Sequence, residues 1–180
     1  GRKRLFLAGA AVFTLASAGC AAAHDIGQLV AARAVQGIGA ALLVPGSLAL
    51  LGANFPESER GRAIGTWSAF SGITAAVGPV VGGLLVDRFS WHWAFLLNLP
   101  IGVLLLAACA ARVPESRGDA AQAPVDLVGA CTATIGLAGI VFALIEAPAH
   151  RIGMAGVAVA ASAGLAALAA FFAWEARAAK

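Results

Sequence analysis

The sequence predicts an all-α membrane protein, a polytopic bundle of six transmembrane helices. Two observations lead to this class. Of the 180 residues, 61% are hydrophobic and 12% are charged, whereas a soluble domain carries about 25% charged residues to cover its surface. Apolar runs of about 20 residues, the length that crosses a bilayer, also recur along the whole chain. Within lipid such runs form helices, because isolated strands would leave backbone groups unpaired.

The candidate spans are separated by short connections. Five runs are free of charge, and the second run is interrupted once, by Arg33. We expect residues 54–60 to form a polar loop, Asp126 to begin a helix, and Glu146 to lie at the outer membrane interface. In chain order, the predicted spans are residues 5–23, 28–53, 63–86, 93–111, 127–145 and 152–174.

The basic residues indicate the orientation of these spans. If residue 1 is cytoplasmic and the spans alternate, nine basic residues lie inside and two, Arg88 and Arg151, lie outside. Such an excess of Lys and Arg is typical of cytoplasmic loops. Both ends are therefore predicted to be cytoplasmic, in a multi-pass protein of the cytoplasmic (inner) membrane. The nine inner residues are Arg2, Lys3, Arg4, Arg60, Arg62, Arg112, Arg117, Arg177 and Lys180.

Other classes of protein fit the sequence less well. The net charge is +3, but the cations are not clustered with exposed aromatic residues, as a nucleic-acid surface requires. Cys20, Cys109 and Cys131 lie inside apolar runs without a CxxC pair, so we interpret them as packing thiols and expect no metal or cofactor. Residues 2–20 resemble a signal peptide with a lipoprotein cleavage site, but five further spans follow them.

Arg33 is the charge that breaks the second span. A charge inside the membrane is costly unless it is paired or hydrated, so such residues are functional candidates. Gln36 follows one helical turn later, and Gly37 continues the same side of the helix. Arg33 and Gln36 are therefore the candidate polar site. The alternative is that Arg33 extends to the outer interface, because it lies roughly 8 Å deep at about 1.5 Å per residue.

Residues 63–86 carry a stripe of small residues at helical spacing. Gly78 and Gly82 have the GxxxG spacing that lets two helix backbones approach closely. Pro79 removes a backbone hydrogen bond and is expected to kink the helix. A kinked, tightly packed helix suits a barrier that must seal and yet shift. The alternative is a generic packing helix, because such patterns are common in membranes.

The segment 91–102 begins at the outer interface, where Trp91 and Trp93 fit an aromatic belt. Asn98 and Pro100 then fall inside the next helix. The Asn98 amide is expected to satisfy carbonyl groups freed by Pro100 or to bridge helices, and lining a cavity is the less favoured alternative.

Together these segments resemble, in order, four motifs of the fourteen-helix drug:proton antiporter branch of the major facilitator superfamily, the EmrB/QacA-like multidrug exporters. The matching residues are Gly1, Arg2 and Lys3 for the cytoplasmic loop motif, Arg33, Gln36, Gly37 and Gly39 for the fourth-helix motif, Gly65, Gly78, Pro79, Gly82 and Gly83 for the fifth-helix antiporter motif, and Trp91, Trp93, Asn98, Pro100 and Gly102 for the sixth-helix motif.

The resemblance implies a domain organisation. Residues 1–111 would be the third to sixth helices of the N-terminal six-helix bundle, residues 112–125 a cytoplasmic loop, and residues 126–180 two extra linker helices between the halves. The chain would then be a fragment, because the first two helices and the C-terminal half have no counterpart in it. Alternating access needs both halves.

The resemblance also implies roles for the motif residues. Arg33 would take part in proton transfer, with Gln36 nearby. The motif around Pro79 would limit leak during export, and Arg2 and Lys3 would join a conformational latch on the cytoplasmic face.

The sequence departs from the family pattern at two positions. Thr74 stands where the fifth-helix motif often has glycine, which loosens the expected close approach. His92 stands where the sixth-helix motif usually has arginine, which puts a charge role at that position in doubt.

The implied function is proton-coupled export of small amphipathic drugs or metabolites by the parent protein, a secondary active transporter and not an enzyme. The expected partners are the lipid bilayer, protons, small-molecule substrates and the missing helices of the same transporter. The alternative is a non-transporting truncated membrane protein or an assembly partner. A membrane-embedded enzyme fits less well, because few polar groups, chiefly Arg33, Gln36 and Asn98, fall inside the spans.

Overall fold

The computed structural model describes residues 1–116, 126–149 and 152–178, and every regular element in them is an α-helix. Among the described residues, six helical stretches are long and apolar enough to cross a membrane, which confirms the predicted class. The chain divides into two compact units, Gly1–Asp119 (unit 1) and Ala120–Lys180 (unit 2). The helices are α1 (Arg2–Ala21), α2 (Ile26–Asn54), α3 (Glu57–Arg88), α4 (Trp91–Leu96), α5 (Asn98–Arg112), α6 (Leu127–Ala149) and α7 (Gly153–Ala178).

The fourth predicted span consists of two consecutive helices, α4 and α5. They are separated by Leu97, whose φ of −55° and ψ of −32° stay in the helical region, so the chain keeps its direction through the break. Pro100 has no backbone N–H to donate to the carbonyl of Leu96, one turn earlier. The missing donor accounts for a break at this position.

The connection between α2 and α3 is shorter than predicted. Residues 54–60 were expected to form a loop, but α2 ends at Asn54 and α3 already begins at Glu57. Pro56 has a φ of −62°, which suits a helix entrance, and Glu57 and Glu59 place negative charge in the first turn of α3. The polar composition therefore marks a charged helix start and not an irregular segment.

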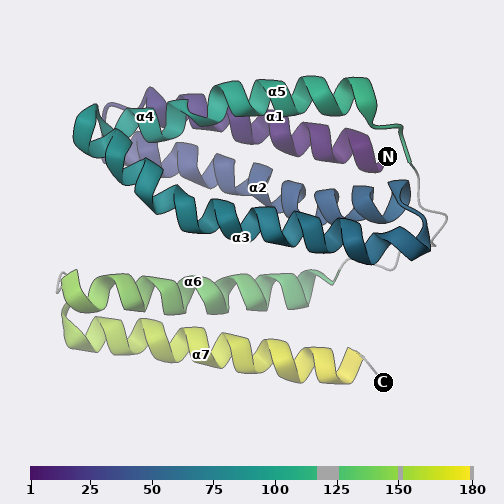
Figure 1. Cartoon of the computed structure of the whole chain (residues 1–180). Coiled ribbons are helices and arrows are strands. Elements are labelled where there is room, and N and C mark those ends of the chain that lie inside the picture. The colour runs from purple at the N-terminus through teal and green to yellow at the C-terminus, as the bar shows by residue number, and fades with distance from the viewer. Residues whose placement is uncertain (117–125, 150–151, 179–180) are drawn as a thin grey trace. The chain divides into compact units, whose positions relative to one another are not determined.

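In unit 1, α1 packs against α2 on one side and against α4 and α5 on the other (Figure 1). The α1–α2 crossing depends on two glycines. A Cβ on Gly39 would lie 2.6 Å from the backbone nitrogen of Phe13 and 2.9 Å from the carbonyl oxygen of Gly9. Because no side chain fits in that space, the two backbones are in direct contact, as in other close membrane-helix crossings.

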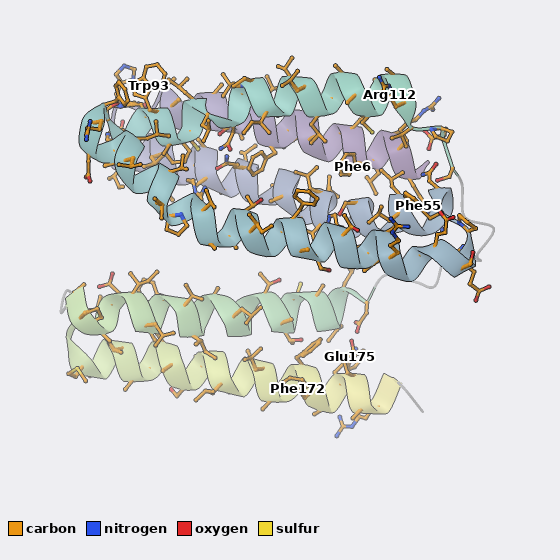
Figure 2. The ribbon with its side chains drawn as sticks, in the orientation of Figure 1. Phe6, Phe55, Trp93, Arg112, Phe172 and Glu175 are labelled. Atoms are coloured by element: carbon orange, nitrogen blue, oxygen red, sulfur yellow. The ribbon has the colours of Figure 1, made fainter. Side chains whose placement is uncertain are left out.

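The ends of unit 1 agree with the alternation of the predicted spans. The N-terminus of α1, the α2–α3 connection and the end of α5 lie at one end of the unit (Figure 1). Figure 2 shows Phe55 and Arg112 at this end and Trp93 at the opposite one. Phe6, Leu50 and Cys109 form a small buried core near the first end.

Unit 2 is a helical hairpin of α6 and α7 (Figure 1). A Cβ on Gly164 of α7 would lie 2.8 Å from the backbone nitrogen of Ile140 and 2.9 Å from the carbonyl oxygen of Gly136, both on α6. Asp126 begins α6 as predicted, since its carboxylate accepts a 2.8 Å hydrogen bond from the Gly129 N–H. The same carboxylate accepts a 2.9 Å hydrogen bond from the Trp174 indole, which joins the two helices at their open end.

Glu146 lies near the end of α6, and its place at the outer membrane interface stays a prediction. Its side chain is buried, with 7% of its surface exposed. A hydropathy run shows where a span ends along the chain, and it does not show which side of the helix packs against a neighbour.

Candidate functional site

Four polar side chains from three helices of unit 1 are joined by hydrogen bonds. They are Ser17 of α1, Arg33 and Gln36 of α2, and Asn98 of α5, and we call them the Ser17 cluster. Ser17 and Gln36 are buried, with 0% and 2% of their surfaces exposed. Polar groups buried in this way need partners, because an unpaired one carries a desolvation cost.

The Ser17 hydroxyl lies at the centre of this cluster. It donates a 3.0 Å hydrogen bond to the backbone carbonyl of Phe95. It accepts a 3.0 Å bond from Gln36 Nε2 and a 2.9 Å bond from Asn98 Nδ2. A hydroxyl has one donor and two acceptor positions, so its capacity is completely used.

The break between α4 and α5 supplies the acceptor for Ser17. Phe95 lies in the last turn of α4, where helix carbonyl groups lack their usual partners four residues later. The Ser17 hydroxyl of the neighbouring helix reaches one of these carbonyls, and Asn98 begins the next helix beside it. The broken span thereby places a backbone acceptor and an amide on the same hydroxyl.

Gln36 connects Ser17 to Arg33 through the two ends of its side-chain amide. Its Oε1 accepts a 2.9 Å hydrogen bond from Arg33 Nη1 and a weak 3.8 Å bond from the Cys20 thiol. The two ends of one amide therefore face different neighbours, with the nitrogen toward Ser17 and the oxygen toward the guanidinium. Arg33 and Gln36 meet as their spacing of three residues predicts.

Arg33 is held by neutral groups. Its guanidinium carbon lies 5.9 Å from the centroid of the Phe95 ring, a cation–π contact. Among the described residues, no carboxylate lies within ion-pair distance of Arg33. The ion pair found in that part of the chain joins Arg4 and Glu115 instead. The positive charge of Arg33 is thus oriented without being neutralised, and it remains able to act on a charged or ionisable group that approaches.

The other predicted residues of the fourth-helix motif differ in their surroundings. Gly39 makes the close crossing with α1, whereas a Cβ on Gly37 would meet nothing within 4 Å. Gly102, of the sixth-helix motif, faces Thr14 of α1 so closely that a Cβ would overlap the Thr14 side chain. The glycines at 39 and 102 therefore allow α2 and α5 to pack against α1.

The fifth-helix motif lies on an open helix. None of the described residues of α3 is buried, and α3 continues through Pro79 as one helix that bends toward α4 in its last turns (Figure 1). A Cβ on Gly65, Gly78, Gly82 or Gly83 would meet nothing within 4 Å. The close approach of another helix to this stripe stays a prediction.

The tryptophans of the sixth-helix motif pack against neighbouring aromatic rings. The Trp91 ring stacks on His92, with ring centroids 3.8 Å apart, and meets the Phe95 ring edge-on at 6.0 Å. Trp93 packs on Phe89 with ring centroids 5.6 Å apart. Pro100 follows at the start of α5, where it limits the hydrogen bonding of α4.

The basic residues at the start of the chain contact the segment that follows α5. Lys3 Nζ donates a 2.8 Å hydrogen bond to the carbonyl of Ala110, and the Lys3 backbone N–H donates a 3.2 Å bond to Glu115. Arg4 Nε lies 3.6 Å from the same carboxylate, and the Arg2 N–H bonds the Ser116 carbonyl at 3.0 Å. A carboxylate at the N-terminus of α1 is also favoured by the helix dipole.

Ser17 is the residue of the cluster that sequence reasoning missed. Hydroxyl groups in helices usually bond a carbonyl of their own preceding turn, as Thr14, Ser71 and Thr74 do here. Nothing in the sequence pattern distinguishes a serine that bonds its own helix from one that reaches a neighbouring helix. Pro100 was the available signal, because a proline can break the helix in the preceding turn and leave a backbone carbonyl free to accept a hydrogen bond.

Comparison with known proteins identifies the family. The model of the Major Facilitator Superfamily matches residues 1–174. The multidrug resistance protein Stp of Mycobacterium tuberculosis is 43% identical over 149 residues, which are 82% of this chain and 28% of that protein. The methylenomycin A resistance protein of Streptomyces coelicolor is 45% identical over 151 residues, 82% of this chain and 31% of that protein.

A third relative agrees with these two. The puromycin resistance protein pur8 of Streptomyces alboniger is 43% identical over 148 residues, 82% of this chain and 29% of that protein. The chain therefore spans between 28% and 31% of the length of these relatives. With the family match, the identities and six membrane-length helices in agreement, the chain belongs to the Major Facilitator Superfamily.

Proposed function

We propose that this chain is part of a proton-coupled exporter of small amphipathic drugs or metabolites in the cytoplasmic membrane. Relatives at 43% to 45% identity are named for multidrug, methylenomycin A and puromycin resistance, which supports export of such molecules. Those relatives are more than three times as long as the matched segment, which supports the view that further helices complete the transporter.

The observation that carries proton coupling is the environment of Arg33. This residue lies within a membrane-length helix and is held by the neutral Gln36 oxygen and the Phe95 ring. Arginine keeps its proton in proteins, so it does not carry the transported proton itself. A fixed positive charge lowers the pKa of an acid that approaches it, and so drives that acid to release its proton. Arg33 therefore acts as the electrostatic trigger for a proton carrier elsewhere in the transporter.

The remaining parts fit the same proposal. Residues 1–111 form the third to sixth helices, residues 112–125 a cytoplasmic loop, and residues 126–180 two linker helices. Of the loop, 117–125 lies outside the described residues. The open stripe of α3 receives a helix of the same transporter and seals the pathway around Pro79, while Arg2 and Lys3 belong to a cytoplasmic latch.

Replacing Arg33 tests this proposal. In energised inside-out vesicles carrying the complete transporter, a cationic dye substrate dissipates the pH gradient if dye and protons are exchanged. We expect Arg33→Ala to abolish this dissipation, because the acid then keeps its proton. The matched control is Arg177→Ala, which removes an arginine from the last turn of α7 in unit 2, far from the cluster in sequence. An unchanged signal in Arg33→Ala at normal expression would refute the role of Arg33 in coupling.

A further inference from the structure

We propose that Ser17 is a positioning residue for Arg33: its hydroxyl sets the orientation of the Gln36 amide, and the amide oxygen then holds the guanidinium. This proposal rests on the proposed function and adds to it a residue that lies outside the four family motifs. It also gives Asn98 a defined part, because Asn98 binds the same hydroxyl from α5.

The direction of the Ser17 hydrogen bonds fixes the amide. Phe95 offers a carbonyl oxygen, so the hydroxyl proton points to it across 3.0 Å. The hydroxyl oxygen can then only accept, and the groups that face it must be donors. Gln36 must therefore present its nitrogen to Ser17 and its oxygen to Arg33, and Asn98 must present its nitrogen as well.

The reversed amide would act against Arg33. If Gln36 turned over, its NH₂ group would face the guanidinium, and two donors cannot bond each other. Arg33 requires the amide oxygen at one end and Ser17 requires the amide nitrogen at the other, whereas the Cys20 thiol bonds only weakly. Ser17 is therefore the second anchor of the amide, besides Arg33 itself. Without the Ser17 hydroxyl, the Gln36 amide loses a partner in a buried place, and the Asn98 amide and the Phe95 carbonyl lose one in a partly buried place.

The cluster also links Arg33 to the break between α4 and α5. Phe95 contacts the cluster twice, through its carbonyl to Ser17 and through its ring to Arg33. A displacement of the last turn of α4 therefore moves both supports of the guanidinium together. Ser17 thus joins the fourth-helix and sixth-helix motifs, because Gln36 and Asn98 both donate to its hydroxyl. Among the described residues, no side-chain hydrogen bond links the two motifs directly.

A double-mutant cycle tests the proposal in the complete transporter. Ser17→Ala should lower the maximal rate of dye-driven proton exchange about five- to tenfold, the effect of losing hydrogen bonds in a buried network. In a Gln36→Leu background the same change should lower the rate by less than about twofold, because Ser17 acts through Gln36. The dye concentration at half-maximal rate should not change. Equal losses in both backgrounds would overturn the proposal.

A second pair of variants separates the hydroxyl from the shape of the side chain. Ser17→Thr and Ser17→Val add similar volume, but only threonine keeps the hydroxyl. We expect the Thr variant to exchange protons at least about fivefold faster than the Val variant, the contribution of one or two hydrogen bonds. Equal rates for the two would overturn the proposal, including when both are slow because of crowding.

Two controls keep this result distinct from the proposed function. Ser162→Ala removes a hydroxyl that bonds Val159 in its own helix in unit 2, and it should leave the rate unchanged. Arg33→Ala is measured in the same vesicles. If Arg33→Ala keeps the wild-type rate, proton coupling through Arg33 fails; if it loses the rate while Ser17→Ala keeps it, only the positioning role of Ser17 fails.

Discussion

Individual side chains of unit 1 differ in how far the sequence predicts their contacts. Arg33 and Gln36 lie three residues apart, and their 2.9 Å hydrogen bond follows from helical spacing within one span. The partner of Gln36 on α1 does not follow from any spacing, because periodicity does not say which helix faces which. Thr14, one turn before Ser17, bonds the Ala10 carbonyl of its own helix at 2.7 Å, which was the default expectation for both residues.

The two glycines of the fourth-helix motif make a matched pair for a stability test in the 180-residue chain. Gly39→Val should destabilise the chain, because its Cβ would lie 2.6 Å from the Phe13 nitrogen and would push α1 and α2 apart. Overpacking of this kind costs at least about 1–3 kcal/mol. The midpoint of unfolding by sodium dodecyl sulfate, followed by circular dichroism, should fall accordingly.

Gly37→Val is the control for that measurement. Gly37 is exposed and has no neighbouring atom within 4 Å of a Cβ position, so the same substitution should leave the midpoint nearly unchanged. Equal effects of the two substitutions would contradict the close contact of α1 and α2 at Gly39.

The helices show which structural features a hydropathy pattern contains. The six spans were predicted, because runs of about 20 apolar residues can be satisfied in lipid only as helices. The early start of α3 at Glu57 and the break at Leu97 were missed. Both depend on backbone hydrogen bonding near a proline, Pro56 in one case and Pro100 in the other, and apolar content does not report on it.

The small-residue stripe of α3 was predicted from the sequence, but its packing partner was not. Its small-residue stripe has the spacing of a close helix crossing, and no other helix of unit 1 covers the glycines at 65, 78, 82 and 83. Within unit 1, no residue of α3 is buried. The stripe therefore supports the proposal that a further helix of the same transporter packs there.

At the scale of the whole molecule, we propose the membrane orientation from the distribution of charges. Arg2, Arg60 and Arg112 belong to segments at one end of unit 1, and Trp93 lies at the other (Figures 1 and 2). In unit 2, Phe172 and Glu175 lie in the last turns of α7 (Figure 2). Three of the counted cations, Arg117, Arg151 and Lys180, lie outside the described residues. The proposed orientation places both chain ends in the cytoplasm.

Cysteine labelling of intact cells checks this orientation. In a chain whose three cysteines are replaced, Ser90→Cys should react with a membrane-impermeant maleimide added outside, because Ser90 precedes α4 at the outer end. Ser58→Cys, in the first turn of α3, should react only after the cells are permeabilised. The opposite pattern would reverse the proposed topology.

Proton-coupled export is tested most directly by imposing pH gradients on proteoliposomes that contain the purified complete transporter. The account predicts that a cationic dye moves opposite to the protons, accumulates against its own concentration gradient, and reverses direction when the pH gradient is reversed, because the two fluxes share one alternating site. Dye movement that only follows the dye's own gradient, whatever the pH difference, would contradict proton-coupled export by this protein.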